Sequence, residues 1–244
     1  MHKSQKSLDK PAIDNQNQDL FVNFTTWGMD SLWKNNMLSL INGNPANILD
    51  LSAGTGILSF SLAEKYPYSN IISMEKSHPL MKLAIEKQKS NNITNVKFVL
   101  ANPEQPSQNL PAGYKADLVI SSYFPLYIDS ALFINDIQSV ITPNSQILLH
   151  DLTFPTILFS PAYIAYFNVL ENVFNYNPTL RQYADYKLYN MIKNTNWVRD
   201  FSTQFKNYGY SVKIYPQLFD VATILDITKN PNAKTMTHGI FPKY

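Results

Sequence analysis

The sequence predicts an α/β fold in which a largely parallel sheet is covered by helices on both faces. A buried strand, Asn47–Leu51, runs into the glycine-rich stretch SAGTG and then into an amphipathic helix. Strand-like and helix-like segments alternate up to residue 152, as is typical of parallel sheets. Two later strand-like runs, Tyr210–Tyr215 and Phe219–Thr228, leave too few residues between them for a crossover helix, so we expect an antiparallel pair.

The individual elements follow from apolar spacing and from the residues that end each segment. A lead-in helix is expected over Trp27–Ile41, because its apolar residues share one face and the run NGNP ends it. Further strands are expected at Asn70–Glu75, Val96–Ala101, Ala116–Tyr123 and Gln146–Leu152, and further helices from the glycine turn to about Tyr66, then at Pro79–Ser90, about Ser130–Val140 and Trp197–Tyr208.

The organisation of the chain indicates one domain over residues 18–230. Residues 154–195 interrupt the alternation and are rich in aromatic residues, so we expect them to form a helical cap insert that serves as a lid. Residues 1–17 are rich in Ser, Lys, Asn and Gln and bury little, so a disordered tail is expected there, with a second tail over 231–244.

The composition excludes several classes of site. The net charge is +2 and Lys and Arg form no long run, so no nucleic-acid partner is expected. The chain has no Cys and its four His residues are scattered, so no metal site is expected. The polar N-terminus and the lack of a long apolar stretch favour a cytoplasmic protein without an integral membrane segment. Peripheral membrane contact and the oligomeric state stay open.

A cofactor site is predicted at the turn that follows the first strand. In DLSAGTG, Gly54 and Gly56 stand where a strand turns sharply into a helix, so the backbone can approach a nucleotide-like ligand closely. Glu75 lies 19 residues beyond Gly56 at the end of the second strand, where a carboxylate accepts hydrogen bonds from a ribose diol. Asn102 ends the third strand, where its amide can accept from an adenine amino group.

Two observations favour S-adenosylmethionine over a nicotinamide dinucleotide in this turn. Ser59 stands where the dinucleotide fingerprint has its third glycine, and the chain ends in an antiparallel strand pair rather than a second mononucleotide-binding half. Asp50 would repel a pyrophosphate, but it suits the positively charged amino group of a methionyl moiety. A nicotinamide-dependent oxidoreductase stays as an alternative function.

Several segments resemble the ubiquinone and menaquinone biosynthesis C-methyltransferases, within the class I methyltransferases. They are TWGMDSLWK (26–34), ILDLSAGTG (48–56), MEKSHPLM (74–81), FVLANPEQ (98–105), HDLTFP (150–155) and YGYSVKIYPQLFDVATILDITK (208–229). The resemblance implies a Rossmann-like, seven-stranded sheet and transfer of a methyl group from S-adenosylmethionine to a ring carbon of a quinol precursor. The matched motifs imply a cofactor site made of Asp50, Ser52, Ala53, Gly54, Gly56, Glu75, Lys76, Asn102 and Pro103. Ser121, at the end of the fourth expected strand, is the further candidate for this site.

The sequence also departs from the pattern of that family. Pro125 and Leu126 stand where the family has an Arg-Asn pair that is thought to activate the quinol. Pro103 has no N–H to offer adenine, and Phe154 stands where the family carries Lys. These departures leave a catalytically silent, methyltransferase-like binding protein as a further alternative.

Methyl transfer needs few catalytic residues, because the enzyme mainly aligns the acceptor with the donor and excludes water. His150, at the end of the fifth strand, is the first candidate for a base, since histidine ordinarily titrates near neutral pH. Asp151 and Tyr123 are the alternatives. The pocket is expected over Ser121–Tyr127 and beneath the insert, where it suits an aromatic or quinone-like acceptor whose reacting atom stays open. The aromatic residues of the insert that can enclose the acceptor are Tyr163, Tyr166, Phe167, Phe174, Tyr183, Tyr186 and Tyr189.

Overall fold

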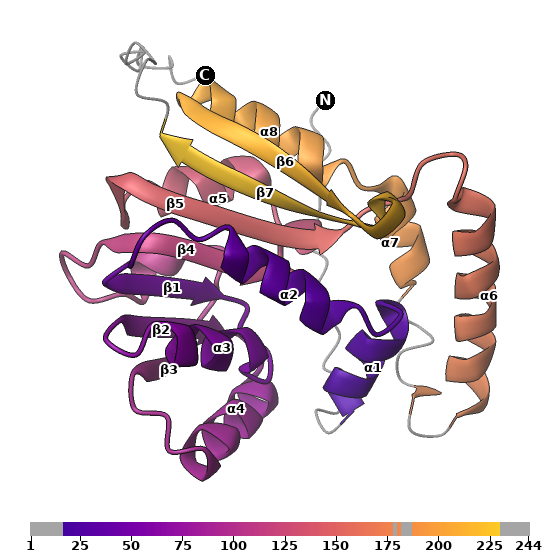
Figure 1. Ribbon diagram of the computed structural model, residues 1–244, viewed down its shortest axis with the longest axis horizontal. Coiled ribbons are helices and arrows are strands. Elements are labelled where there is room, and N and C mark those ends of the chain that lie inside the picture. The colour runs from indigo at the N-terminus through magenta and orange to yellow at the C-terminus, as the bar shows by residue number, and fades with distance from the viewer. Residues whose placement is uncertain (1–16, 178–179, 182–186, 230–244) are drawn as a thin grey trace, which may run out of the picture.

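The computed structural model describes residues 17–177, 180–181 and 187–229. Its strands are β1 (Asn47–Leu51), β2 (Asn70–Glu75), β3 (Val96–Leu100), β4 (Ala116–Ser122), β5 (Ile141–Leu152), β6 (Tyr210–Gln217) and β7 (Ala222–Lys229). They form one seven-stranded sheet in the order β3-β2-β1-β4-β5-β7-β6 (Figure 1). The strands β1 to β5 pair in parallel, and β7 is antiparallel to β5 and β6. The predicted α/β fold with an antiparallel C-terminal strand pair is confirmed.

Two apolar cores cover the two faces of the sheet. The helices are α1 (Gln18–Thr25), α2 (Asp30–Ser39), α3 (Ile57–Lys65), α4 (His78–Ser90), α5 (Ser130–Ile137), α6 (Ser160–Tyr176), α7 (Leu188–Asn194) and α8 (Trp197–Asn207). Ile48 of β1 belongs to the core that includes residues of α2 and α3, whereas its neighbour Leu49 belongs to the core that includes residues of α5 and α8. Because side chains alternate along a strand, Asp50 points to the same face as Ile48, towards α2 and α3.

Helices α1, α6 and α7 lie beside the edge of the sheet where the parallel strands end (Figure 1). Aromatic rings join α1 to α6: the ring centroids of Phe21 and Phe174 are 5.6 Å apart, and those of Trp27 and Tyr166 are 5.0 Å apart. Both α6 and α7 fall within residues 154–195, where the sequence predicts a helical insert. These helices thus border the space beyond the carboxyl ends of the parallel strands.

The structure corrects two predicted boundaries. The lead-in region forms α1 and α2 rather than one helix over Trp27–Ile41, because Trp27 and Gly28 adopt φ +56° and +73° and interrupt the helical backbone between them. Strand β5 begins at Ile141, before the expected Gln146. Ser145 makes this extension possible, since its hydroxyl accepts a hydrogen bond from the backbone N–H of Thr142 (2.7 Å) and donates one to the backbone of β4 (2.6 Å).

Some expectations fall on residues that the structure does not describe. The two predicted tails lie outside the described ranges, apart from residue 17. The same is true of Tyr183 and Tyr186, which were expected to help enclose the methyl acceptor. Within those ranges, no helix is long and apolar enough to cross a membrane. The same part of the chain contains no group of three or more His, Asp or Glu side chains placed to hold a metal ion.

Candidate active site

The turn after β1 is shaped by hydrogen bonds from its backbone to β2. The N–H of Ala53 donates to the carbonyl of Met74 (2.8 Å), and the N–H of Gly54 donates to the Glu75 carboxylate (2.8 Å). Gly54 adopts φ +58°, and a Cβ added there would meet no atom within 4 Å. The turn therefore leaves open space in front of Gly54, where a ligand can reach the backbone.

Glu75 joins this turn to the start of α4. Its other carboxylate oxygen accepts a hydrogen bond from the backbone N–H of Ser77 (2.8 Å), and the residue is 2% exposed. Each oxygen has accepted one backbone N–H, so each retains a lone pair for a further donor. The two bonds fix the carboxylate at the end of β2, where Glu75 lines a small cavity of about 300 Å³.

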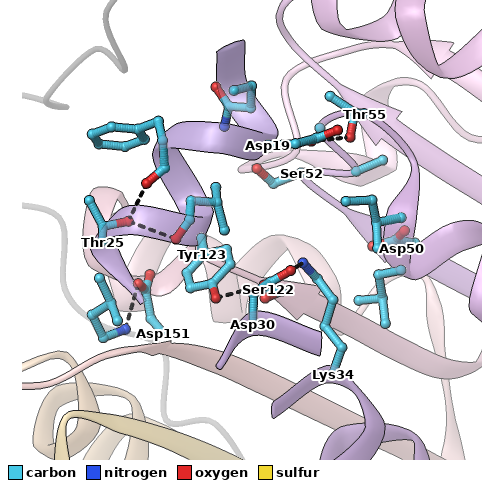
Figure 2. Close-up of a pocket in the computed structure, with 18 of the residues that line it drawn as sticks. Asp19, Thr25, Asp30, Lys34, Asp50, Ser52, Thr55, Ser122, Tyr123 and Asp151 are labelled. Carbon is cyan, nitrogen blue, oxygen red and sulfur yellow. Dashed lines mark hydrogen bonds and ion pairs between the residues drawn. The ribbon is translucent and has the colours of Figure 1, made fainter. Parts of the chain in front are cut away.

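A larger cavity adjoins the small one at this edge of the sheet. It encloses about 880 Å³ including its open mouth. Ser52, Tyr123 and Tyr127 line both cavities, so the two meet at these side chains. Figure 2 shows Asp50 on the right of the larger cavity and Asp151 on the left, with Tyr123 between them. The two cavities therefore form one continuous space along this edge of the sheet.

Asp50 and Asp151 are the most deeply buried carboxylates that line the larger cavity, each with 1% exposure. The hydroxyl of Ser59 on α3 donates to it (2.5 Å). Burial raises the pKa of Asp50 to about 7, while the Ser59 hydrogen bond and the charge of Lys34 lower it and the charge of Glu75 raises it. A cationic group beside Asp50 would therefore favour its carboxylate form.

A second set of polar side chains, from α2 and the end of β4, lines the same cavity (Figure 2). The Lys34 Nζ lies 2.5 and 2.6 Å from the two carboxylate oxygens of Asp30, and the Tyr123 hydroxyl donates to Asp30 (2.8 Å). Asp30 and Lys34 are 9% and 8% exposed, so water hardly reaches this ion pair. Burial first, and then the charge of Asp30, raise the pKa of Tyr123 well above its ordinary value.

Helix α1 is tied to the turn after β1 and to α4 through Asp19. One oxygen of the Asp19 carboxylate accepts from the hydroxyl of Thr55 (2.7 Å), and the other pairs with the Lys87 Nζ of α4 (2.8 Å). The Lys87 and Asp19 side chains are 39% and 44% exposed. Asp19 and Thr55 both line the cavity, so α1 forms part of its wall (Figure 2).

Comparison with known families identifies the family of the chain. Residues 43–199 match the model of a family described as a methyltransferase domain. The chain belongs to this family. Membership confirms the predicted class of enzyme and its predicted methyl donor, S-adenosylmethionine, and it replaces the alternative of a nicotinamide-dependent oxidoreductase.

The methyltransferase is also similar to curated proteins over parts of its length. It is 32% identical to the release factor glutamine methyltransferase of Aliivibrio fischeri over 92 residues, which are 38% of this chain and 31% of that protein. It is 25% identical to the demethylmenaquinone methyltransferase of Thermus thermophilus over 138 residues, 56% of this chain and 60% of that protein. In both cases the match spans less than two thirds of the relative.

Solved structures share the fold over nearly the whole methyltransferase. A proposed S-adenosyl-L-methionine-dependent methyltransferase from Methanococcus maripaludis aligns with a TM-score of 0.62 at 18% identity, over 96% of this chain and 99% of that one. The plantazolicin methyltransferase BpumL, solved in complex with SAH, aligns with a TM-score of 0.59 at 12% identity, over 89% and 91% of the two chains. These likenesses confirm the class I methyltransferase fold.

The predicted cofactor residues of the methyltransferase divide into two groups. Those that line the cavities are Asp50, Ser52, Ala53, Gly54, Glu75, Lys76 and Pro103. Gly56, Ser121 and Asn102 are not among the lining residues. A Cβ at Gly56, where φ is +86°, would lie 2.7 Å from Phe60, so packing requires this glycine. The Ser121 hydroxyl donates to the backbone of β1 (2.6 Å), and the exposed Asn102 accepts from a backbone N–H two residues on (3.1 Å). The geometry does not support cofactor contacts from these three.

The geometry also argues against His150 as the base. The side chain is fully buried, its Nδ1 lies 2.9 Å from the Ser122 hydroxyl, and it is not among the residues that line the cavity. Burial, helped by the charge of Lys34, lowers the pKa of His150 to about 3, so the ring stays neutral and is a very weak base. The two alternatives, Asp151 and Tyr123, both line the cavity. Asp151 accepts from the backbone N–H of Leu126 (2.9 Å).

Sequence reasoning missed the polar residues that α1 and α2 bring to the cavity. Asp30 and Lys34 stand four residues apart and flank Trp33, which is 1% exposed. Opposite charges at this spacing share one helix face, and their position beside a buried tryptophan is the available signal that the pair faces the interior. Asp19 carries no comparable signal, because its partners Thr55 and Lys87 are far away in the sequence.

Proposed function

We propose that the chain is an S-adenosylmethionine-dependent methyltransferase that acts on a small aromatic or quinone-like molecule. The observation that carries the proposal is the larger cavity, where Asp50 and the open turn at Gly54 share one space with Tyr123, Asp30 and Lys34. A donor with a cationic amino group and an acceptor can therefore meet at the C-terminal edge of the sheet.

The groups around the turn fit the parts of the donor. Asp50 would hold the amino group, and the two free lone pairs of Glu75 would accept from the ribose hydroxyls. The small cavity is lined by Pro103, Phe124 and Ile128, which offer adenine apolar contact. Once bound, the donor supplies a methyl group on a positively charged sulfur.

The acceptor side of the larger cavity is apolar and suits an aromatic ring. Phe21, Tyr127, Leu152 and Leu188 line it. The similarity to demethylmenaquinone methyltransferases supports a quinone-like acceptor, and the structural likeness to the mitomycin 7-O-methyltransferase MmcR (TM-score 0.58, 15% identity) supports a small aromatic acceptor more generally. The chain would act by aligning this ring with the donor and by excluding water.

The proposal extends to the organisation of the chain. Residues 18–230 would form one methyltransferase domain with residues 154–195 as its cap, in a cytoplasmic protein whose acceptor is not a nucleic acid. A catalytically silent binding protein is the second candidate. It is favoured by Pro125 and Leu126, which stand where the ubiquinone and menaquinone C-methyltransferases have their Arg-Asn pair. Both residues are buried here.

Calorimetric titration with S-adenosylhomocysteine tests the donor site. The wild type is expected to bind, and Glu75→Gln is expected to weaken the affinity at least about tenfold. Glutamine replaces one of the two accepting oxygens by an NH2 group, which cannot accept from the backbone N–H that faces it or from a ribose hydroxyl. Glu64→Gln, on an exposed position of α3, is the matched control and should bind like the wild type. Absence of heat with the wild type would overturn the proposal.

Mass spectrometry tests the reaction itself. Incubation with S-adenosylmethionine and menadiol, a small quinol, is expected to give a product one methyl group heavier. A protein that binds S-adenosylhomocysteine but methylates neither menadiol nor simpler phenols would support the silent alternative.

A further inference from the structure

The polar cluster of Asp30, Lys34 and Tyr123 is not needed to bind the donor as assigned above. All three side chains line the larger cavity, yet the proposed donor contacts lie at Asp50, the glycine turn and Glu75. An ion pair with so little exposure gains little stability over apolar residues of similar size, because both charges lose their hydration. The position of the cluster therefore suggests a chemical role.

The hydrogen bonds of the cluster leave one donor and one acceptor position free for a ligand. Lys34 gives two N–H groups to the two oxygens of Asp30, so one N–H remains. The Tyr123 hydroxyl gives its proton to Asp30, so its oxygen can still accept. Within the described part of the chain, neither the Lys34 ammonium group nor the Tyr123 hydroxyl has a hydrogen-bond partner other than Asp30. A hydroxyl group of a ligand can use both positions, since it can donate to Tyr123 and accept from Lys34.

The backbone holds Tyr123 where this role requires it. The residue follows β4 directly and adopts φ +60°, which is rare for a bulky side chain and persists only when the surroundings enforce it. Its N–H donates to the carbonyl of His150 (2.8 Å), and its ring lies 5.4 Å from the Lys34 Nζ. The strained conformation and these contacts fix the hydroxyl between Asp30 and the cavity.

We propose that Tyr123, Asp30 and Lys34 form a proton relay that selects an acceptor with an acidic hydroxyl, such as a phenol, a quinol or an enol. This inference rests on the proposed function. The acceptor O–H bond breaks as its proton passes to the Tyr123 oxygen, while Tyr123 passes its own proton to the Asp30 carboxylate. Lys34 stabilises the oxyanion that remains.

The methyl step then balances in charge and electrons. An electron pair of the oxyanion, on oxygen or on the conjugated ring carbon, forms the new bond to the methyl carbon. The bond between the methyl carbon and sulfur breaks, and its electron pair stays on the neutral sulfur. For attack by a ring carbon, the hydrogen of that carbon leaves afterwards as a proton to water at the open mouth of the cavity. Asp30 returns its proton through Tyr123 to the oxygen, and the ring regains its aromaticity.

Two properties of the cluster agree with the relay. Burial raises the pKa of Tyr123, so this residue stays a neutral hydroxyl that can pass a proton on rather than a phenolate. Asp30 and Lys34 lie on one helix, four residues apart, so the distance between the proton acceptor and the stabilising cation is fixed by α2.

Visible absorption of 4-nitrophenol in the complex with S-adenosylhomocysteine tests the relay, because the phenolate absorbs at a longer wavelength than the phenol. At a pH about one unit below the pKa of the free phenol, the wild-type complex is expected to raise the ionised fraction of bound probe at least about fivefold. Tyr123→Phe keeps the ion pair and should lose this phenolate band, while its affinity for S-adenosylhomocysteine stays within about twofold. Tyr114→Phe, which removes a hydroxyl that is bonded to the backbone of β1 far from the cavity, should keep the band.

Asp30→Asn is the second variant, and it should also lose the band because an amide is a far weaker proton acceptor. Equal ionisation of free and bound probe in a wild type that binds S-adenosylhomocysteine would overturn the relay and leave the proposed function intact. So would a phenolate band retained in Tyr123→Phe. If Lys34→Met lost affinity for S-adenosylhomocysteine but kept the band, Lys34 would belong to the donor site and the relay would be wrong. Failure of the wild type to bind S-adenosylhomocysteine would instead contradict the proposed function.

Discussion

The two halves of the large cavity are built in different ways. The proposed donor half is made mostly by backbone groups of one short turn. A single carboxylate, Glu75, holds this turn through the N–H of Gly54, and its other oxygen accepts from Ser77 at the start of α4. The acceptor half is made by side chains from α2 and the end of β4, which meet only in the folded protein. Local chain geometry thus defines the donor half, and tertiary packing defines the acceptor half. Substitutions in the two halves should therefore differ in their effects on stability and on ligand affinity.

The largest effect is expected in the acceptor half. Lys34→Met leaves the Asp30 carboxylate buried without its cation, which should lower the free energy of unfolding by about 3–5 kcal/mol. Urea denaturation followed by circular dichroism measures this. The double variant Lys34→Met with Asp30→Leu should recover most of the loss, since it removes both charges. A loss below about 1 kcal/mol in the single variant would show that the pair is solvated, and that the acceptor half is less closed than the structure indicates.

Substitution of the two glycines of the donor half should affect different properties: Gly56 mainly the stability, and Gly54 mainly the affinity for the ligand. Gly56→Ala places a Cβ 2.7 Å from Phe60 at φ +86°, so it should lower the free energy of unfolding by about 2 kcal/mol. Gly54→Ala meets no atom within 4 Å, so it should lose only about 1 kcal/mol, from φ +58°. Its methyl group projects into the open space, so calorimetry should show the larger loss of S-adenosylhomocysteine affinity for Gly54→Ala. The reverse order of affinities would place the ligand elsewhere.

Donor binding should also depend on pH. The pKa of Asp50 is raised to about 7 in the free protein, so a bound ammonium group must draw out a proton below that pH. The affinity for S-adenosylhomocysteine should therefore rise about tenfold from about pH 6 to pH 8. Titrations in buffers of different ionisation enthalpy should show proton release at the lower pH. Asp50→Asn should bind weakly and without this dependence, and an equal slope in that variant would contradict the assignment.

The same pKa shift has the opposite sign for stability. The folded protein holds a proton on Asp50 that the unfolded chain, with an ordinary aspartate pKa of 3.8, has lost. The contribution of Asp50 to the free energy of unfolding should therefore fall as pH rises from about 4 to about 7. Urea denaturation at pH 5 and pH 7, compared with Asp50→Asn, measures this contribution.

The fold and the donor half could be predicted from the sequence because their signals are local. Strand β1, the turn and Glu75 follow one another within a short stretch, and apolar alternation and glycine mark them directly. Gly56 was singled out for closeness to a ligand, and its cofactor role stays a prediction; the structure adds that a Cβ there would lie 2.7 Å from Phe60.

The acceptor half could not be predicted in the same way. His150 looked suitable by its ordinary pKa and its place at a strand end, but only the packing shows that burial deprives it of basicity. The contact between Tyr123 and Asp30 joins residues 93 positions apart, so no short motif reveals it. Helix α1 was missed because the positive φ of Trp27, which separates it from α2, has no signature in the sequence.

The attachment of α1 by Asp19 has a consequence for how ligands enter. Its ion pair with Lys87 is open to solvent, so dissolved salt weakens it and should let α1 move away from the cavity more often. Salt also weakens the long-range attraction between a cationic donor and the carboxylates of the cavity. These two influences act in opposite directions on the association rate. The rate should therefore depend less on ionic strength than the attraction alone would make it.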